Sequence, residues 1–163
     1  MRAGSGLRIG EALGLELRHV AGCTLTVEQS CWQGSLQTPK TFNALRKVDL
    51  SHDLAAALHR FIGRRKIGLM FANYCGNPMS QTNLLKRSLH PLLEECGSER
   101  MGFHALRRFR ATWLRKQHAP EDLIRYWLDH ANQTVTDGYS KLSEDEKFRL
   151  EVAQNVGIGY TVV

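Results

Sequence analysis

The spacing of apolar residues changes along this sequence, and that change constrains the fold more than any other feature. Apolar and polar residues alternate over 23–29 and 46–50, which predicts two or three short antiparallel strands. From residue 52 onward, apolar residues recur every three or four positions, as is typical of helices. The order predicts an α+β fold, mostly helical with a small antiparallel sheet near the N-terminus, rather than an alternating βαβ design.

Capping and helix-breaking residues give the bounds of the helices. Helices are predicted over residues 7–17, 52–65, 80–97, 104–118, 121–128, 132–139 and 143–155. In the helix over 80–97, Ser80 is the expected cap, Pro91 the expected kink and Gly97 the stop. Its leucines are expected to face the core, namely Leu84, Leu85, Leu89, Leu92 and Leu93.

Length and charge suggest one domain with an acidic partner. A chain of 163 residues is long enough for a single domain over 1–163 with a sizeable core. Its 22 Lys and Arg residues exceed its 16 Asp and Glu residues, which gives a net charge of +6. This balance fits a polyanionic partner but is not specific for one.

The cysteines and the hydropathy argue against zinc and membrane classes. Cys23, Cys31, Cys75 and Cys96 form no C-x-x-C pair, so we expect reduced cysteines that pack in the protein. No signal peptide opens the chain, and no apolar run approaches 18 residues. We therefore expect a cytoplasmic location and no membrane partner.

The segment GFHALRRFRATWL, residues 102–114, combines an apolar helix with unusual positive charge. Residues three apart share a helix face, so His104 and Arg107 should point toward the same place. Four large apolar residues are expected to anchor the helix in the core, namely Phe103, Leu106, Phe109 and Trp113. An arginine offers a planar fork of N–H donors that matches two oxygens of a phosphate or carboxylate. The segment alone predicts only a basic amphipathic helix.

Four segments together resemble the catalytic domain of the tyrosine recombinases, also called phage integrases. AGSGLRIGEALGLELRHV is similar to the first arginine box of the family, with Arg8 and Glu11 in its arginine and acidic positions. TPKTFNALRKVDL resembles the strand-turn-strand that carries the family's lysine, here Lys40.

The other two segments lie in the C-terminal half and follow the family's order. HALRRFRATWL resembles the H-x-L-R box and gives His104 and Arg107. WLDHANQTVTDGYSKL resembles the last box, with His130 in its His/Trp position and Tyr139 in the position of the nucleophile. The resemblance covers nearly the whole chain.

The resemblance implies cleavage and rejoining of double-stranded DNA by transesterification. Tyr139 would attack a phosphodiester to form a 3′-phosphotyrosyl bond, while Arg8 and Arg107 stabilise charge on the non-bridging oxygens. His104 would act as base or proton relay, Lys40 would protonate the departing 5′ oxygen, and His130 would donate a hydrogen bond to the phosphate. The sequence has no carboxylate cluster and no H-E-x-x-H motif, so no metal is expected. The resemblance implies that the reaction needs no cofactor or ATP, because the phosphotyrosyl bond stores the energy of the cleaved backbone.

Several assignments have rivals. Lys47 competes with Lys40, and three other tyrosines compete with Tyr139, namely Tyr74, Tyr126 and Tyr160. Glu11 is expected to orient either Arg8 or His104. Arg108 and Arg110 are candidate contacts for the DNA backbone, where they would add affinity without sequence information.

Three functions remain open at this stage. The leading one is a site-specific recombinase; the alternatives are a non-catalytic DNA-binding remnant and a type IB topoisomerase. The chain starts seven residues before Arg8, so the family's upstream helices and DNA-clasping domain are expected to be missing. The family resemblance further implies four subunits assembled on DNA, with residues 143–163 as a candidate segment for exchange between neighbours or for packing on their own domain.

Overall fold

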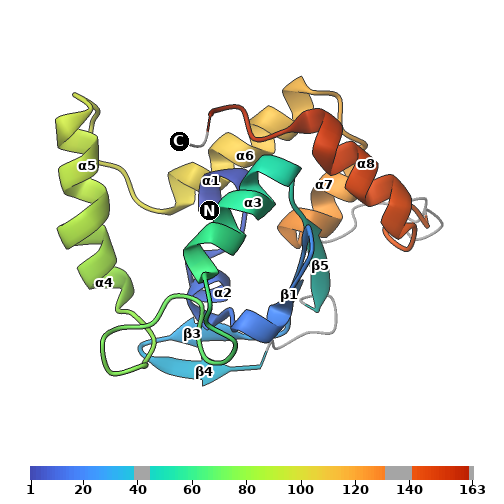
Figure 1. The fold of residues 1–163 in the computed structure, drawn as a ribbon. Helices are drawn as coiled ribbons and strands as arrows, with labels where there is room; N and C mark the ends of the chain where they lie inside the picture. Colours follow the sequence, from blue (N-terminus) through green and yellow to red (C-terminus); the bar gives the residue numbers. More distant parts are fainter. Residues whose placement is uncertain (39–44, 131–140, 162–163) are drawn as a thin grey trace.

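A small antiparallel sheet lies near the N-terminal part of the fold, as expected. The computed structural model describes residues 1–38, 45–130 and 141–161 (Figure 1). The sheet has the order β1-β2-β5, formed by Val20–Ala21, Thr24–Val27 and Arg46–Asp49. Leu25 is paired with Val48 across β2 and β5, which directs apolar side chains to one face.

A separate hairpin joins β3 (Ser30–Trp32) to β4 (Ser35–Gln37). Its turn residues, Gln33 and Gly34, both have positive φ, at 48° and 81°, which suits the twist of a two-residue hairpin. This hairpin was not predicted, because the segment carries little alternation and many turn-forming residues.

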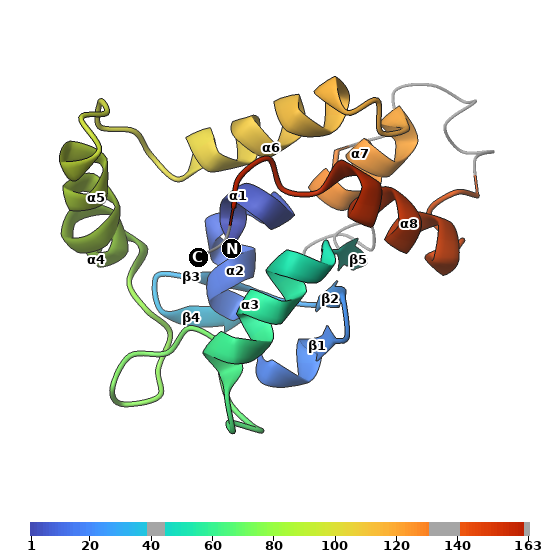
Figure 2. The same cartoon turned by 45° about the horizontal axis from the view of Figure 1, so that its top comes forward.

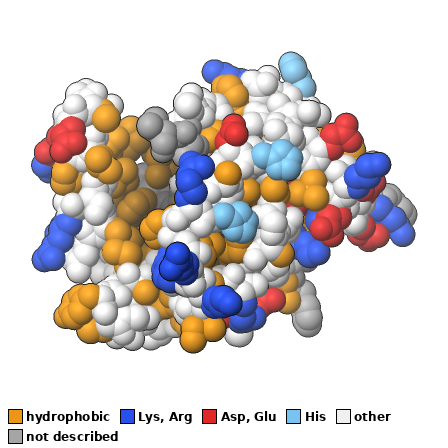
Figure 3. All heavy atoms as spheres, viewed as in Figure 1, with side chains coloured by type: hydrophobic (Ala, Val, Ile, Leu, Met, Phe, Trp, Pro, Cys, Tyr) orange, Lys and Arg blue, Asp and Glu red, His pale blue; other side chains and the backbone are white. Residues whose placement is uncertain are grey.

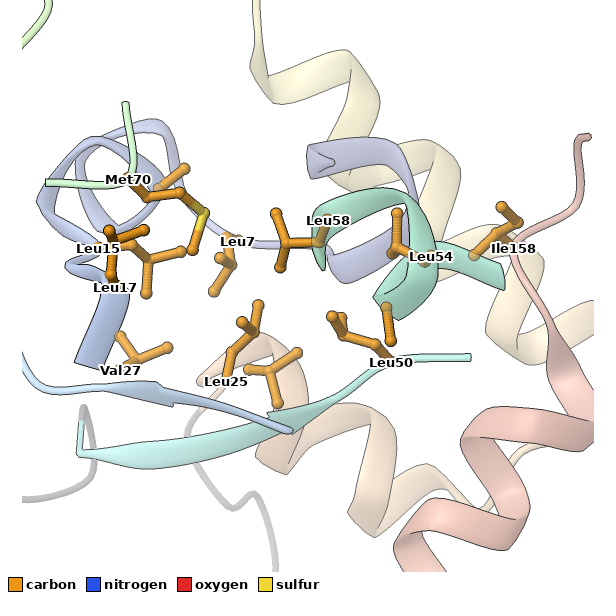
Figure 4. Close-up of a cluster of buried hydrophobic side chains, with 13 residues drawn as sticks. Leu7, Leu15, Leu17, Leu25, Val27, Leu50, Leu54, Leu58, Met70 and Ile158 are labelled. Carbon is orange, nitrogen blue, oxygen red and sulfur yellow. The ribbon is translucent and has the colours of Figure 1, made fainter. Parts of the chain in front are cut away.

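The sheet packs against the N-terminal helices and α3 (His52–Ile62) to form the first hydrophobic cluster (Figure 4). The predicted helix over 52–65 forms but ends at Ile62, and its buried face includes Leu54 and Leu58. The helix predicted over 7–17 forms only as α2 (Ile9–Gly14), after which the chain is extended at Leu15. It is preceded by a short helix, α1 (Arg2–Ser5).

The helix over 80–97 forms, but it stands apart from the rest of the fold. It consists of α4 (Gln81–Leu84), a π-helical segment over Leu85–Leu89, and α5 (His90–Glu95). Ser80 caps it as predicted, because its Oγ accepts a hydrogen bond from the Asn83 amide. Figure 3 shows hydrophobic side chains beside the hollow between this arm and the main body.

The predicted burial of the arm's leucines is wrong. No residue of α4, the π-helical segment or α5 is buried, and the Leu92 side chain is 57% exposed. Their helical spacing gives the right secondary structure, but the other four leucines are only half-buried.

The second hydrophobic cluster joins three C-terminal helices, α6 (His104–Lys116), α7 (Glu121–Leu128) and α8 (Glu146–Val156). Asp145 caps α8 with its carboxylate, which accepts from the Phe148 amide at 2.9 Å. Ala153 and Val156 of α8 are buried in this cluster, so α8 packs against α6 and α7 of the same chain. The helix predicted over 132–139 lies outside the described residues.

The buried face of α6 differs from the one predicted. Arg107, Arg110 and Leu114 are buried, whereas Phe109 is 41% exposed and stacks on Trp113. α6 lies beside α1, as both ribbon views show (Figure 2), and the two arginines bond to carbonyl oxygens of neighbouring chain segments. Arginine can be buried at such a position because each carbonyl compensates part of its lost hydration.

The carboxylate of Asp49 connects the two clusters. It accepts hydrogen bonds from Thr24 Oγ1 at 3.0 Å, from Trp127 Nε1 at 2.9 Å and from Arg149 Nε at 2.9 Å. These partners belong to β2, α7 and α8, and the Asp49 side chain is fully buried. One charged residue of β5 therefore ties the sheet to both helices.

The cysteines and the apolar character of the helices were also predicted from the sequence. All four cysteines are free, but Cys75 and Cys96 are exposed, so only Cys31 is fully buried as a packing residue. Among the described residues, none of the helices has the length and apolar character needed to cross a membrane.

Candidate active site

Arg8 and Glu11 form a local unit at the start of α2. Arg8 is the extended residue that precedes the helix, and Glu11 reaches back so that its Oε2 accepts from the Arg8 amide at 2.8 Å. Glu11 Oε1 also accepts from Arg8 Nη1 at 3.1 Å. This use of a glutamate in the first turn stabilises the helix start and fixes the direction of the arginine side chain.

Arg46 holds Glu11 from the other side. Its Nη1 and Nη2 donate to the two oxygens of Glu11 at 3.1 and 2.9 Å, and its Nε donates to the Trp127 carbonyl at 2.9 Å. Burial by itself would raise the pKa of Glu11, but the hydrogen bonds and charges of Arg46 and Arg8 outweigh it and lower the pKa. Glu11 is therefore an ionised carboxylate held between two arginines.

Arg107 lies beside this unit with unused donor capacity. Its side chain is buried, and Nη1 donates to the Gly6 carbonyl at 2.8 Å. Its Nη2 is also buried and has no hydrogen-bond partner among the described residues. Burial and the nearby charge of Arg8 lower the pKa of Arg107 to about 10, so it remains protonated at neutral pH.

Gly6 makes this position of Arg107 feasible. Its φ is 76°, and a Cβ atom there would lie 2.5 Å from a methyl group of Leu128. A side chain would both strain the backbone and displace Leu128, so glycine lets the Gly6 carbonyl approach Arg107.

The turn after α7 completes the site. Asp129 accepts from Arg8 through its carboxylate and, at 3.1 Å, through its main-chain oxygen. The next residue, His130, closes the helix end with its amide bonded to the Arg125 carbonyl at 3.0 Å. Loss of hydration and the positive charges of Arg107 and Arg8 lower the pKa of His130 below its usual value.

His130 should titrate below the ordinary histidine range. We expect a lowered pKa in the free protein, because loss of hydration and the charges of Arg107 and Arg8 disfavour the imidazolium. The substitution Arg8→Gln removes one of these cations and should raise that pKa, as measured by NMR titration of the ring protons. An unchanged His130 pKa in the variant would contradict the assigned cause.

The structure describes four of the six predicted catalytic residues. It brings Arg8, Arg107 and His130 into one electrostatic cluster, whereas His104 is the exposed first residue of α6, one turn before Arg107. Lys40 and Tyr139 lie outside the described residues.

Three of the four rivals of Lys40 and Tyr139 are engaged in other contacts. Lys47 Nζ pairs with Glu146 at 3.5 Å, and the Tyr126 hydroxyl accepts from the Lys47 amide at 3.0 Å. Tyr160 packs beside Phe109, and Tyr74 is fully exposed.

The two candidate contacts for the DNA backbone differ. Arg108 is exposed, as that role requires. Arg110 is 2% exposed and its Nη1 donates to the Gly157 carbonyl, so the expectation for Arg110 is corrected. Arg110 fastens the segment after α8 to α6.

Sequence reasoning missed Arg46 and Asp129. A signal for Arg46 was present, because strand alternation places it on the same face as the buried Val48. Asp129 gave no comparable signal, since its contacts depend on the left-handed turn after α7. No group of three or more metal-binding side chains lies together in the described part of the chain.

Comparison with known sequences decides the family. The sequence model described as "Phage integrase family" matches residues 2–146, a span that contains all six predicted catalytic positions. The chain belongs to the phage integrase family. The family assignment confirms the resemblance on which those positions were predicted.

Two relatives of this integrase-family chain are named tyrosine recombinases. It is 28% identical over 157 residues to tyrosine recombinase XerC of Halalkalibacterium halodurans, covering 86% of this chain and 48% of that protein. It is 27% identical over 163 residues to a XerC-like tyrosine recombinase of Caldanaerobacter subterraneus subsp. tengcongensis, covering 82% of this chain and 41% of that protein. The chain thus spans about half the length of these relatives or less.

Solved integrase structures share the fold. The Tn1549 transposon integrase, in complex with circular intermediate DNA, superposes with a TM-score of 0.68 at 22% identity, covering 90% of this chain and 56% of that one. The integrase of mycobacterium phage Brujita gives a TM-score of 0.67 at 18% identity, covering 99% and 51%. The predicted α+β fold of the integrase type is therefore confirmed.

Proposed function

We propose that this chain carries the chemistry of a site-specific recombinase that breaks and rejoins double-stranded DNA. The observation that carries the proposal is the buried Nη2 of Arg107, which lacks a partner among the described residues and lies in the same charge cluster as Arg8 and His130. An unused donor on a buried cation favours an incoming anion. A DNA phosphodiester provides one.

The proposed reaction needs no external energy source. The bond from phosphorus to the 5′ oxygen breaks while a bond forms from phosphorus to Tyr139 Oη, leaving a 3′-phosphotyrosyl linkage. The tyrosine proton passes to His104, and Lys40 supplies a proton to the 5′ oxygen. Rejoining reverses these steps, because the phosphotyrosyl bond conserves the energy of the cleaved linkage.

Each arginine has a distinct part in this proposal. Arg107 provides buried donors in a place with little competing water, where such donors stabilise developing charge most strongly. Arg8 is held by Glu11 and Asp129 and presents its remaining N–H groups to the same phosphate. His130, neutral at pH 7, donates a ring N–H to a non-bridging oxygen.

Further parts of the proposal concern assembly and location. The Tn1549 integrase was solved with DNA, which supports DNA as the partner here. We propose four subunits on two DNA sites, and a cytoplasmic location follows from that substrate. Exchange of residues 143–163 between subunits would require α8 to leave its own hydrophobic cluster.

A suicide DNA substrate tests the proposal. A nick near the cleavage position lets the 5′ fragment diffuse away, so a covalent protein–DNA adduct should accumulate. Peptide mapping by mass spectrometry should place the linkage on Tyr139. Salt-sensitive DNA binding without an adduct on any duplex would favour a non-catalytic DNA-binding protein instead. Relaxation of supercoiled plasmid without a defined site would indicate a topoisomerase.

A further inference from the structure

Asp129 occupies a backbone position that aims two acceptors at one arginine. Its φ and ψ are 49° and 53°, in the left-handed region that few residues other than glycine, asparagine and aspartate adopt. In this turn the Asp129 carboxylate Oδ2 and main-chain oxygen both accept from Arg8. The same turn leads directly into His130, so one short segment places both a histidine and the contacts of Arg8.

Counting the donors of Arg8 shows which part of its guanidinium remains open. Nη1 donates to Glu11 Oε1 at 3.1 Å and to the Asp129 carboxylate, which uses both of its hydrogens. Nη2 donates once, to the main-chain oxygen of Asp129 at 3.1 Å. The Nε hydrogen and the second Nη2 hydrogen make no hydrogen bond to the described residues. These two form the side edge of the fork, which can bind two oxygens of one phosphate.

The charges in the cluster are nearly balanced around this open edge. Glu11 is shared by Arg8 and Arg46, and Asp129 is the second carboxylate that contacts Arg8. Both carboxylates approach through Nη1, and a guanidinium is planar, so they lie away from the Nε–Nη2 edge. Asp129 therefore restrains Arg8 without occupying the edge that faces an incoming anion.

We infer that Asp129 is a positioning residue for phosphate recognition, because its two oxygens hold Arg8 with the Nε–Nη2 edge directed at the scissile phosphate. This inference rests on the proposed recombinase function. Asp129 acts through Arg8 and touches no reacting atom. Arg8 is half-exposed, with 47% of its side chain accessible, so without Asp129 it has many alternative rotamers.

The test compares Asp129→Asn and Asp129→Gly, because both residues tolerate the left-handed turn. Single-turnover adduct formation is measured on the suicide duplex over a range of DNA concentrations. Asp129→Gly should lower the maximum rate about 10- to 100-fold, the range expected for losing one charged hydrogen bond. Asp129→Asn keeps an oxygen acceptor, so its maximum rate should fall several-fold less than that of Asp129→Gly. The DNA concentration for half-maximal rate should change by less than about threefold.

Controls separate positioning from charge and from folding. Asp53→Asn makes the same charge change at an exposed site in α3 and should leave the rate unchanged. In the Arg8→Ala background, Asp129→Gly should cause no further loss, since the residue that it positions is gone. Melting temperatures report whether either Asp129 variant is unfolded.

Two results would overturn the inference while leaving the recombinase proposal intact. Faster cleavage or tighter DNA binding in both Asp129 variants would mean that the carboxylate competes with phosphate. If Asp129→Gly lowers the rate as much in the Arg8→Ala background as in the unmodified chain, Asp129 acts on something other than Arg8. If the unmodified chain forms no adduct at all, both the function and the inference fail.

Discussion

The substitution Arg107→Lys should lower the rate of covalent adduct formation about 10²- to 10³-fold. Lysine keeps the positive charge, but its single ammonium cannot reproduce both the Nη1 bond to the Gly6 carbonyl and the donors of the buried Nη2. The loss should appear in the maximum single-turnover rate on the suicide duplex. Charge alone is thus insufficient, and the planar fork is the required feature.

An exposed arginine of α3 gives a matched control for this experiment. Arg60→Lys makes the same substitution outside the candidate site and should change the rate by less than about twofold. Arg107→Lys leaves the Gly6 carbonyl without its donor, so stability should also fall by about 1–3 kcal/mol. A folded Arg107→Lys variant that cleaves at the unmodified rate would exclude Arg107 from the phosphate site.

Arg46→Met should reduce the free energy of unfolding by about 3–5 kcal/mol at pH 7, because it leaves the buried Glu11 carboxylate without its main partner. Urea denaturation measures this change. Lys47→Met is the matched control on the same strand. The Lys47 side chain makes an exposed pair with Glu146 at 3.5 Å, so its loss should cost less than about 1 kcal/mol.

The Arg46 effect should also depend on pH in a defined direction. In the unmodified chain the pKa of Glu11 is lowered, so its stabilising contribution is complete above its ordinary pKa and is lost as pH falls through the folded value. Without Arg46, burial opposes ionisation and the Glu11 pKa rises, so the variant accepts a proton more readily. The difference between the two proteins should therefore narrow from pH 7 to pH 4. A constant difference would show that Glu11 is not the group left unpaired.

Much of the secondary structure could be predicted from the spacing of apolar residues, whereas burial often could not. The strand alternation around Leu25 and Val48 and the cap at Ser80 were readable, because they depend on residues close in sequence. The exposure of Leu92 and Phe109 could not be predicted, because helical spacing specifies an apolar face but not whether another element covers that face. Buried arginines such as Arg110 reverse the usual rule, since distant carbonyl oxygens compensate them.

The same division applies to the candidate site. Arg8, His104, Arg107 and His130 were predicted from motifs in which neighbouring residues carry the signal. Arg46 and Asp129 meet Glu11 and Arg8 only through tertiary contacts, the latter across 121 residues of sequence. No local pattern encodes such a pairing. The residues that hold a site in place are therefore harder to predict than those that act in it.

The buried carboxylate of Asp49 has a consequence for how this protein unfolds. Its two oxygens accept hydrogen bonds from β2, in one hydrophobic cluster, and from α7 and α8, in the other. If either cluster opens alone, the Asp49 carboxylate loses part of its hydrogen bonds while it remains buried in the other cluster. The free-energy cost of such a buried, poorly paired charge exceeds that of most partial openings. The two clusters should therefore melt in one cooperative transition, with equal calorimetric and van't Hoff enthalpies. Thermodynamically the site is inseparable from the sheet, although Arg107, Asp129 and His130 come from the C-terminal part of the chain.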